Sequence, residues 1–116
     1  MLDATGHVNR AMTYQWHQMP RLRARVDAVQ AGCVKALLGA GCRVQSLAAL
    51  GKGVPDALVS NPWGELFLLE FKSEDGKLGE HQETWHQHWS RCTRAGTLHI
   101  VRTPEEALIA VGVKRP

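Results

Sequence analysis

A continuous apolar run, LFLL at residues 66–69, limits what this chain can fold into more than any other feature of its sequence. Four successive apolar residues leave a strand without a polar face, which indicates a central strand covered on both sides. A turn signal at residues 61–64 precedes the run, and Asp75-Gly76 follows it. We therefore expect a strand over residues 65–72 inside a sheet that carries packed elements on both faces.

Three helices and three shorter strands are expected around this strand. In residues 21–38, apolar residues recur at spacings of three and four, and glycines at positions 39 and 41 end the pattern. The expected helices span residues 21–38, 79–94 and 103–111, and the expected short strands span residues 43–47, 56–59 and 97–101.

The order of these elements, αβββαβ(α), predicts the fold class. The strands on either side of Pro62 are close enough in sequence for a hairpin, whereas the strand at 97–101 follows a helical crossover, which favours a parallel neighbour. A chain of 116 residues suits one domain. We expect a single α/β domain over residues 21–116, with a mixed central sheet flanked by helices. An irregular arm at residues 1–20 is expected to precede it.

The composition disfavours membrane proteins and disulfide-rich secreted proteins. The hydrophobic share is 44%, and no apolar run approaches the roughly 18 residues of a membrane helix. The first residues lack the basic and apolar blocks of a secretory signal, so a cytoplasmic location is expected. The three cysteines form no C-x-x-C pair and are expected to be reduced, mostly buried thiols.

The net charge of +3 is unevenly distributed along the chain. Residues 1–52 hold seven Lys/Arg and two Asp/Glu, a net +5, whereas residues 53–116 hold seven Lys/Arg and nine Asp/Glu, a net −2. This division suits a protein that contacts phosphate with one surface and a cation with another. Many basic proteins bind no nucleic acid, so charge alone does not decide the function.

The pattern that carries chemistry is GVPD at residues 53–56, followed after thirteen residues by Glu70-Phe71-Lys72. Glu70 and Lys72 are two positions apart, so both side chains point to one face of the strand, whereas Phe71 points to the other. In a hairpin, Asp56 at the start of one strand can lie beside Glu70 near the end of the next. This predicts two carboxylates and an amine at a single site.

Two neighbouring carboxylates form an oxygen-rich site that suits Mg²⁺ or Mn²⁺. Such a cation polarises a phosphodiester and lowers the pKa of a bound water. A lysine beside it stabilises charge on phosphate oxygens or orients the attacking water. The alternative is structural, namely a Glu70–Lys72 surface ion pair beside an unrelated Asp56.

These residues resemble the VRR-NUC branch of the PD-(D/E)XK nuclease superfamily, whose fold is like that of restriction endonucleases. The resemblance covers roughly residues 21–112. The E-x-K element alone is common, but five matching elements in this order are specific. The matching elements are KGVPD at 52–56, EFK at 70–72, GKL at 76–78, Gln82, and a strand after Gly96 that leads to Glu105-Glu106.

The resemblance implies a role for each matched site residue. Asp56 and Glu70 would bind the metal, and the backbone carbonyl of Phe71 would be a further ligand. Lys72 would be the catalytic lysine. Gln82 would reach back to the site from its helix.

The resemblance also directs attention to the first helix and to basic residues. Family members often add an acidic residue from that helix to the metal site, and here Asp27 and Gln30 are the two candidates. Several basic residues would contact DNA phosphates, or would instead form a solvated face. These are Lys52, Lys77, Arg21, Arg23 and Arg25.

Residues 80–89, EHQETWHQHW, contain three histidines and two tryptophans. His81, His86 and His88 lack the spacing of a zinc site, and we expect solvated histidines, with phosphate contact by His81 or His86 as the alternative. Trp85 and Trp89 share one helical face and are expected to be core or dimer contacts rather than platforms for base stacking.

The resemblance implies a phage-type hydrolase that cuts DNA phosphodiester bonds with Mg²⁺ or Mn²⁺, encoded by a phage or its bacterial host. Small family members are similar to Holliday-junction resolvases, so branched DNA is the expected substrate. One chain carries one site, so cutting both strands requires two copies and predicts a homodimer. No phosphate-binding G-x-x-x-x-G-K-[ST] loop is present. Two alternatives are a catalytically silent DNA-binding module and a helper subunit of a phage replication or packaging complex.

Overall fold

The computed structural model describes residues 21–116, with side chains from Asp27 onward. The expected arm at residues 1–20 and the side chains of Arg21, Arg23 and Arg25 lie outside the described residues. The elements are α2 (Arg21–Gly39), β1 (Arg43–Ser46), the 3-10 turn η1 (Ala48–Leu50), β2 (Ala57–Ser60), β3 (Leu66–Phe71), α3 (Glu80–Ser90), β4 (Leu98–Val101) and α4 (Pro104–Ala110).

Each helix and strand expected from the sequence is present. Helix α3 is shorter than expected and ends at Ser90 rather than at residue 94. The amide of Cys92 bonds to the carbonyl of Trp89, three residues back, which tightens the last turn out of α-helical geometry. Helix α4 begins as expected, because the Thr103 hydroxyl accepts a hydrogen bond from the amide of Glu106 and Pro104 occupies the first turn.

The four strands form one mixed sheet in the order β1-β2-β3-β4. Strands β1, β2 and β3 are antiparallel neighbours, and β4 runs parallel to β3. The expected hairpin around Pro62 is therefore confirmed, as is the parallel strand that follows the helical crossover. The register pairs Ala57 with Leu69 across the hairpin and Glu70 with Ile100 across the parallel pair.

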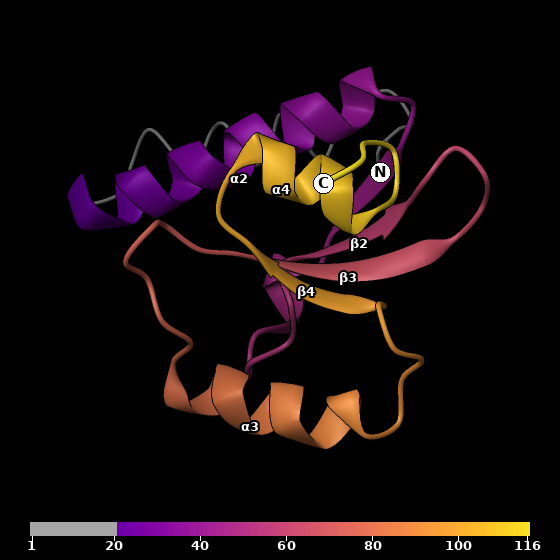
Figure 1. Cartoon of the computed structure of the whole chain (residues 1–116). Helices are drawn as coiled ribbons and strands as arrows, with labels where there is room; N and C mark the ends of the chain where they lie inside the picture. The colour runs from indigo at the N-terminus through magenta and orange to yellow at the C-terminus, as the bar shows by residue number, and fades with distance from the viewer. Residues whose placement is uncertain (1–20) are drawn as a thin grey trace.

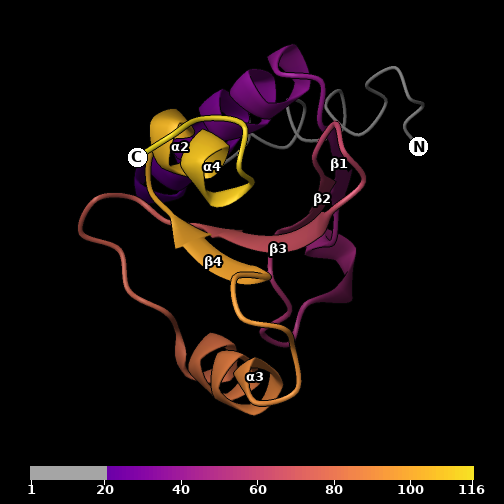
Figure 2. The same ribbon diagram turned by 45° about the vertical axis from the view of Figure 1, so that its right-hand side comes forward.

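Helices cover both faces of this sheet (Figure 1). Helices α2 and α4 lie side by side on one face, and α3 lies on the opposite face. The turned view in Figure 2 shows the same three layers, with the sheet between the helix pair and α3. None of the helices in residues 21–116 is long and apolar enough to cross a bilayer.

The main core lies between the sheet and the helix pair α2 and α4. Alternate strand residues point into it, as expected for a pleated sheet. Phe71 and Leu69 on β3 are both fully buried. The core cluster comprises Cys33, Val34, Leu37, Cys42, Val44, Ala57, Val59, Leu69, Phe71, Val101, Ala107 and Val111. The thiols of Cys33 and Cys42 are buried as expected, whereas Cys92 is exposed.

The opposite face of the sheet is less completely covered, because α3 contributes no buried residue. Leu66 begins β3 beside the turn and opposite Ser60, and 59% of its surface is exposed. The expectation that residues 66–69 are covered on both faces is therefore wrong at Leu66. The face under α3 instead contains the buried carboxylate of Glu70.

Asn61 fixes the turn that joins β2 to β3. Its carboxamide oxygen accepts hydrogen bonds from the amides of Trp63 and Glu65, and its Nδ2 donates to the carbonyl of Val111 at 2.9 Å. The side chain is only 3% exposed. Because a slip of one residue would invert the faces of a strand, this turn helps to set which residues of β2 face those of β3.

Candidate active site

The hairpin register brings Asp56 and Glu70 together. Ala57 pairs with Leu69, so Asp56 stands opposite Glu70 at the end of the ladder. The backbone N–H of Phe71 donates a hydrogen bond to Oδ2 of Asp56 at 2.8 Å. Asp56 is thus held against β3 by the backbone, with its carboxylate at the end of the strand.

Glu70 is buried, with 1% of its surface exposed. Its two carboxylate oxygens have different surroundings. Oε2 accepts a hydrogen bond from Nε2 of Gln82 at 2.7 Å, whereas Oε1 has no hydrogen-bond partner within residues 21–116. A buried acceptor without a donor is costly and is a place where a ligand would be stabilised.

Gln82 links the carboxylate to the lysine. Its Oε1 accepts hydrogen bonds from Nζ of Lys72 at 2.8 Å and from the amide of Gly79 at 2.8 Å. Lys72 Nζ also lies 3.7 Å from Oε2 of Glu70. The carboxamide therefore orients both ends of the E-x-K pair, while the N-terminus of α3 orients the carboxamide.

The electrostatics of this cluster disfavour two free carboxylates. Burial and the adjacent charge of Asp56 raise the pKa of Glu70 to about 8. Burial also raises the pKa of Asp56, and the Phe71 amide partly opposes that rise. A buried carboxylate next to a half-buried one retains a proton between them unless a positive charge replaces it. The site is thus suited to a cation.

His86 is a part of this cluster that sequence reasoning missed. Its side chain is only 12% exposed, and its Nε2 lies 3.9 Å from Oε1 of Glu70. The expectation of a solvated histidine is wrong here, because α3 turns His86 toward the sheet, whereas His81 and His88 are exposed as expected. Burial and the nearby charge of Lys72 lower the pKa of His86, and the charge of Asp56 partly opposes that fall. Its four-residue spacing from Gln82 was the available signal.

The candidates on α2 lie near the site to different extents. Asp27 is close enough for its charge to raise the pKa of Asp56. Gln30 is half-buried one turn further along the same helix. Asp27 is therefore the acidic side chain of α2 that accompanies the Asp56–Glu70 pair.

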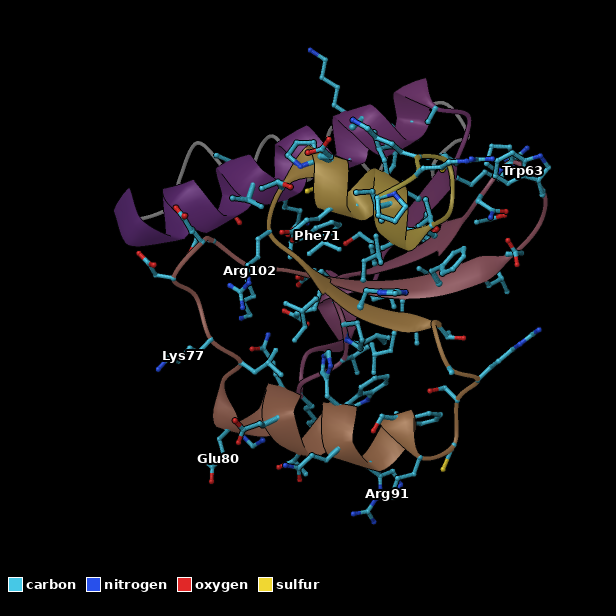
Figure 3. All side chains as sticks on the ribbon, in the orientation of Figure 1. Trp63, Phe71, Lys77, Glu80, Arg91 and Arg102 are labelled. Carbon is cyan, nitrogen blue, oxygen red and sulfur yellow. The ribbon has the colours of Figure 1, made fainter. Side chains whose placement is uncertain are left out.

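The predicted phosphate-binding residues with described side chains lie outside the buried cluster. Lys52 is exposed and has a positive φ of 54° in the loop before Asp56. Lys77 is exposed on the segment between β3 and α3, where Figure 3 shows its side chain pointing away from the sheet. Both flank the site, one on each of its connecting loops.

Arg102 is a second residue that sequence reasoning missed. It follows β4 directly, and its Nη1 donates to the carbonyls of Ser73 at 2.6 Å and Gly76 at 2.7 Å. Figure 3 shows the side chain of Arg102 beside the segment that joins β3 to α3. One guanidinium thus ties the segment after Lys72 to β4. A single arginine after a strand gives no sequence signal for this long-range contact.

The loop before Asp56 is fixed against the first turn of α3. Gly53 has a φ of +85°, and a Cβ at this position would lie 2.2 Å from the carbonyl oxygen of His81. Only glycine allows so close an approach. The GVPD segment therefore sets the distance between Asp56 and the turn that carries Gln82.

The residues present fit a hard divalent cation in their chemistry. Asp56 and Glu70 supply carboxylate oxygens. Oε1 of Glu70 is a buried acceptor without a hydrogen-bond donor among the described residues. Within residues 21–116, no three His, Cys, Asp or Glu side chains are grouped closely enough to hold a metal ion by themselves. A cation here would complete its shell with water, substrate or backbone oxygens, as Mg²⁺ sites commonly do.

Comparison with known proteins identifies the fold. The sequence matches no protein-family model and no curated protein. A solved structure described as a VRR_NUC domain is similar, with a TM-score of 0.62 and 26% sequence identity. The similarity covers 73% of this chain and 94% of that one. The chain therefore has the fold of the VRR-NUC family, a nuclease-type domain with a four-stranded mixed sheet.

Proposed function

We propose that this protein is a metal-dependent endonuclease that hydrolyses DNA phosphodiester bonds. The observation that carries the proposal is the buried carboxylate of Glu70, which lies beside Asp56 and is linked through Gln82 to Lys72. Burying a carboxylate is unfavourable for folding and contributes nothing that an apolar residue would not supply. Such a cluster on the fold of a nuclease-type domain favours a catalytic role over a structural one.

In the proposed mechanism Asp56 and Glu70 would hold Mg²⁺ or Mn²⁺, and the carbonyl of Phe71 would be a further ligand. When bound, the cation polarises the phosphodiester and lowers the pKa of a water. Lys72 stabilises negative charge on the phosphate or orients the attacking water. Gln82 holds the side chains of Lys72 and Glu70 in their relative positions through its hydrogen bonds to both. Asp27 adds negative charge from α2. The attacking water gives up a proton to solvent as its oxygen bonds to phosphorus, the bond to the leaving sugar oxygen breaks, and that oxygen takes up a proton from solvent.

The proposed substrate is branched DNA, such as a four-way junction, and the proposed active form is a homodimer. Lys52 and Lys77 are exposed on the loops that precede Asp56 and α3, and in this proposal they contact DNA phosphates near the scissile bond. Arg21, Arg23 and Arg25 extend this proposed contact along the start of α2. A single site cuts a single strand, so two copies are needed to cut both strands of a junction.

A catalytically silent DNA-binding module, or a helper subunit of a phage complex, is the competing proposal. Either would retain the fold and the basic residues. Neither requires Glu70 to be buried next to Asp56, or Lys72 to be fixed by Gln82. The intact cluster therefore favours the enzyme.

A cleavage assay tests the proposal. Labelled four-way junction, duplex and single-stranded DNA would be incubated with the protein in Mn²⁺, Mg²⁺ or EDTA. Removing the amine in Lys72→Ala should lower the cleavage rate by about 10²- to 10³-fold, the usual effect of losing one charge-stabilising group. Lys35→Ala, an exposed lysine on α2, is the matched control and should cleave like the wild type.

Cleavage that requires the metal and Lys72 supports the enzyme, and the fastest substrate identifies its preference. If both variants and the wild type bind DNA equally and none cuts it under any condition, the enzyme proposal is wrong. The silent module or the helper subunit then takes its place.

A further inference from the structure

Two buried polar atoms of the cluster, one on Glu70 and one on His86, lie close together without hydrogen-bond partners among the described residues. Oε1 of Glu70 and Nε2 of His86 are 3.9 Å apart, and neither has a hydrogen-bond partner within residues 21–116. The distance is too long for a direct hydrogen bond. Two unpartnered polar atoms at one buried place are uncommon in a folded protein and indicate that something else binds between them.

Helix α3 presents both of its site residues to the same carboxylate. Gln82 and His86 are four residues apart and so lie on one face of the helix. Gln82 holds Oε2 of Glu70, which leaves Oε1 directed to His86. Gln82 donates a hydrogen bond to Oε2, and Nζ of Lys72 lies 3.7 Å from it, so Glu70 cannot turn away from the imidazole without losing those contacts.

The chemistry of the two atoms selects what would bind. An imidazole that carries its proton on Nδ1 has a lone pair on Nε2, and a carboxylate oxygen has only lone pairs. Both therefore accept positive charge, and a divalent cation satisfies both at once. Two donors on one cation stand at most about 4.2 Å apart, twice a bond of about 2.1 Å. The observed separation lies within that limit.

We propose that His86 is a ligand of the catalytic cation, beside Glu70, and that this nitrogen makes the site prefer Mn²⁺ to Mg²⁺. The inference rests on the proposed metal-dependent function and names its cation. Oxygen ligands suit Mg²⁺ and Mn²⁺ alike, whereas an imidazole ligand is suited to first-row transition metals. A site with one nitrogen ligand therefore discriminates between cations that two carboxylates alone would not separate.

The test measures binding and coordination rather than cleavage. Wild-type protein freed of metal with EDTA would be titrated with Mn²⁺ alone and with Mg²⁺ alone, without DNA. Pulsed electron paramagnetic resonance of the Mn²⁺ complex would detect ¹⁴N coupling from a bound imidazole. We expect the ¹⁴N signal in the wild type and in His88→Leu, an exposed histidine on the same helix, but not in His86→Leu.

The Mn²⁺ affinity should fall together with the ¹⁴N signal. His86→Leu should weaken Mn²⁺ binding by at least about tenfold, in line with the loss of a supporting group at a metal site, and should change Mg²⁺ binding far less. His86→Gln, which retains a polar side chain, serves if the leucine variant fails to fold, and circular dichroism would establish folding in each case. Equal loss for both cations would contradict the proposed preference.

The outcomes separate this inference from the proposed function. Mn²⁺ binding without ¹⁴N coupling, in a protein that cuts DNA, would overturn the role of His86 and leave the nuclease intact. ¹⁴N coupling that depends on His86, in a protein that cuts nothing, would support the ligand and reject the nuclease. A wild type that binds no Mn²⁺ overturns the ligand, and the cleavage assay then decides the function separately.

Discussion

At the residue scale, the burial of the Glu70 carboxyl couples its protonation to the stability of the fold. Its carboxyl is buried beside Asp56, and its pKa is raised to about 8. The folded protein therefore binds the proton of Glu70 more tightly than the unfolded chain does. By linkage, this contribution to stability is largest at low pH and is lost as the pH rises from about 4.5 toward 8.

The first prediction follows from this loss of stability with rising pH. In EDTA, the melting temperature of the wild type should fall between pH 7 and pH 9, a range above the lowered pKa of His86. Glu70→Gln keeps a similar shape without the charge, so its melting temperature should fall less. Calorimetry at several pH values would measure both. Parallel curves for the two proteins would show that Glu70 is not the group responsible.

A second prediction at this scale concerns the thiols. Cys33 is fully buried, and burial together with the charge of Glu106 raises its thiol pKa to about 12. Burial also raises the pKa of Cys42, whereas Cys92 is exposed. At pH 8, iodoacetamide should add once to the folded protein and three times in guanidinium. Intact mass spectrometry would count the adducts, and two rapid additions to the folded protein would contradict the assigned core.

The residue scale also shows why some of the site was predictable. Asp56, Glu70 and Lys72 follow from the alternation of a strand and from the hairpin, both of which are local patterns. Their meeting needs only the register Ala57 to Leu69. The spacing of His86 from Gln82 indicates a shared helix face, but its contact with Glu70 depends on how α3 packs on the sheet, which no local pattern predicts.

At the element scale, two contacts beyond those of Gln82 help to position α3 and the segment before it. Arg102 after β4 holds the carbonyls of Ser73 and Gly76, and Gly53 touches the backbone of His81. The sequence predicts each helix and strand well, since periodicity and glycine positions are local. It does not predict these contacts, because each joins segments far apart in the chain.

The third prediction tests the Gly53 contact. Gly53→Ala should place a methyl group against the His81 carbonyl, displace the first turn of α3, and reduce DNA cleavage as Gln82 leaves Lys72 and Glu70. Gly64→Ala is the matched control, since Gly64 has a φ of +89° and an added methyl group would meet no atom within 4 Å. Both variants bear the cost of a left-handed alanine, of the order of 1 kcal/mol. Guanidinium denaturation should show the greater loss in Gly53→Ala, and equal losses would exclude the contact.

At the scale of the whole molecule, one chain offers one site and several exposed large apolar side chains. Trp89 is 44% exposed, and its ring centroid lies 5.1 Å from that of Trp85 in a stacked arrangement. Of the two roles expected for Trp89, a core contact is therefore wrong, and a dimer contact stays a prediction.

The fourth prediction is that the protein sediments as a dimer and cuts both strands of a junction. Analytical ultracentrifugation, with the cleavage products, would check this. A monomer that only nicks would contradict it.

The absence of buried residues on α3 has a consequence for how the protein responds to heat. Helix α3 carries Gln82 and His86, yet the fully buried core lies on the other face of the sheet. Segments with little buried surface open at lower free energy than the core and exchange their amide hydrogens sooner. The temperature at which activity disappears should thus lie below the temperature at which the sheet melts. Cooling should restore activity, because the sheet has not unfolded at the lower of these two temperatures. Substitutions on α3 should therefore change the temperature at which activity is lost without changing the melting temperature of the sheet.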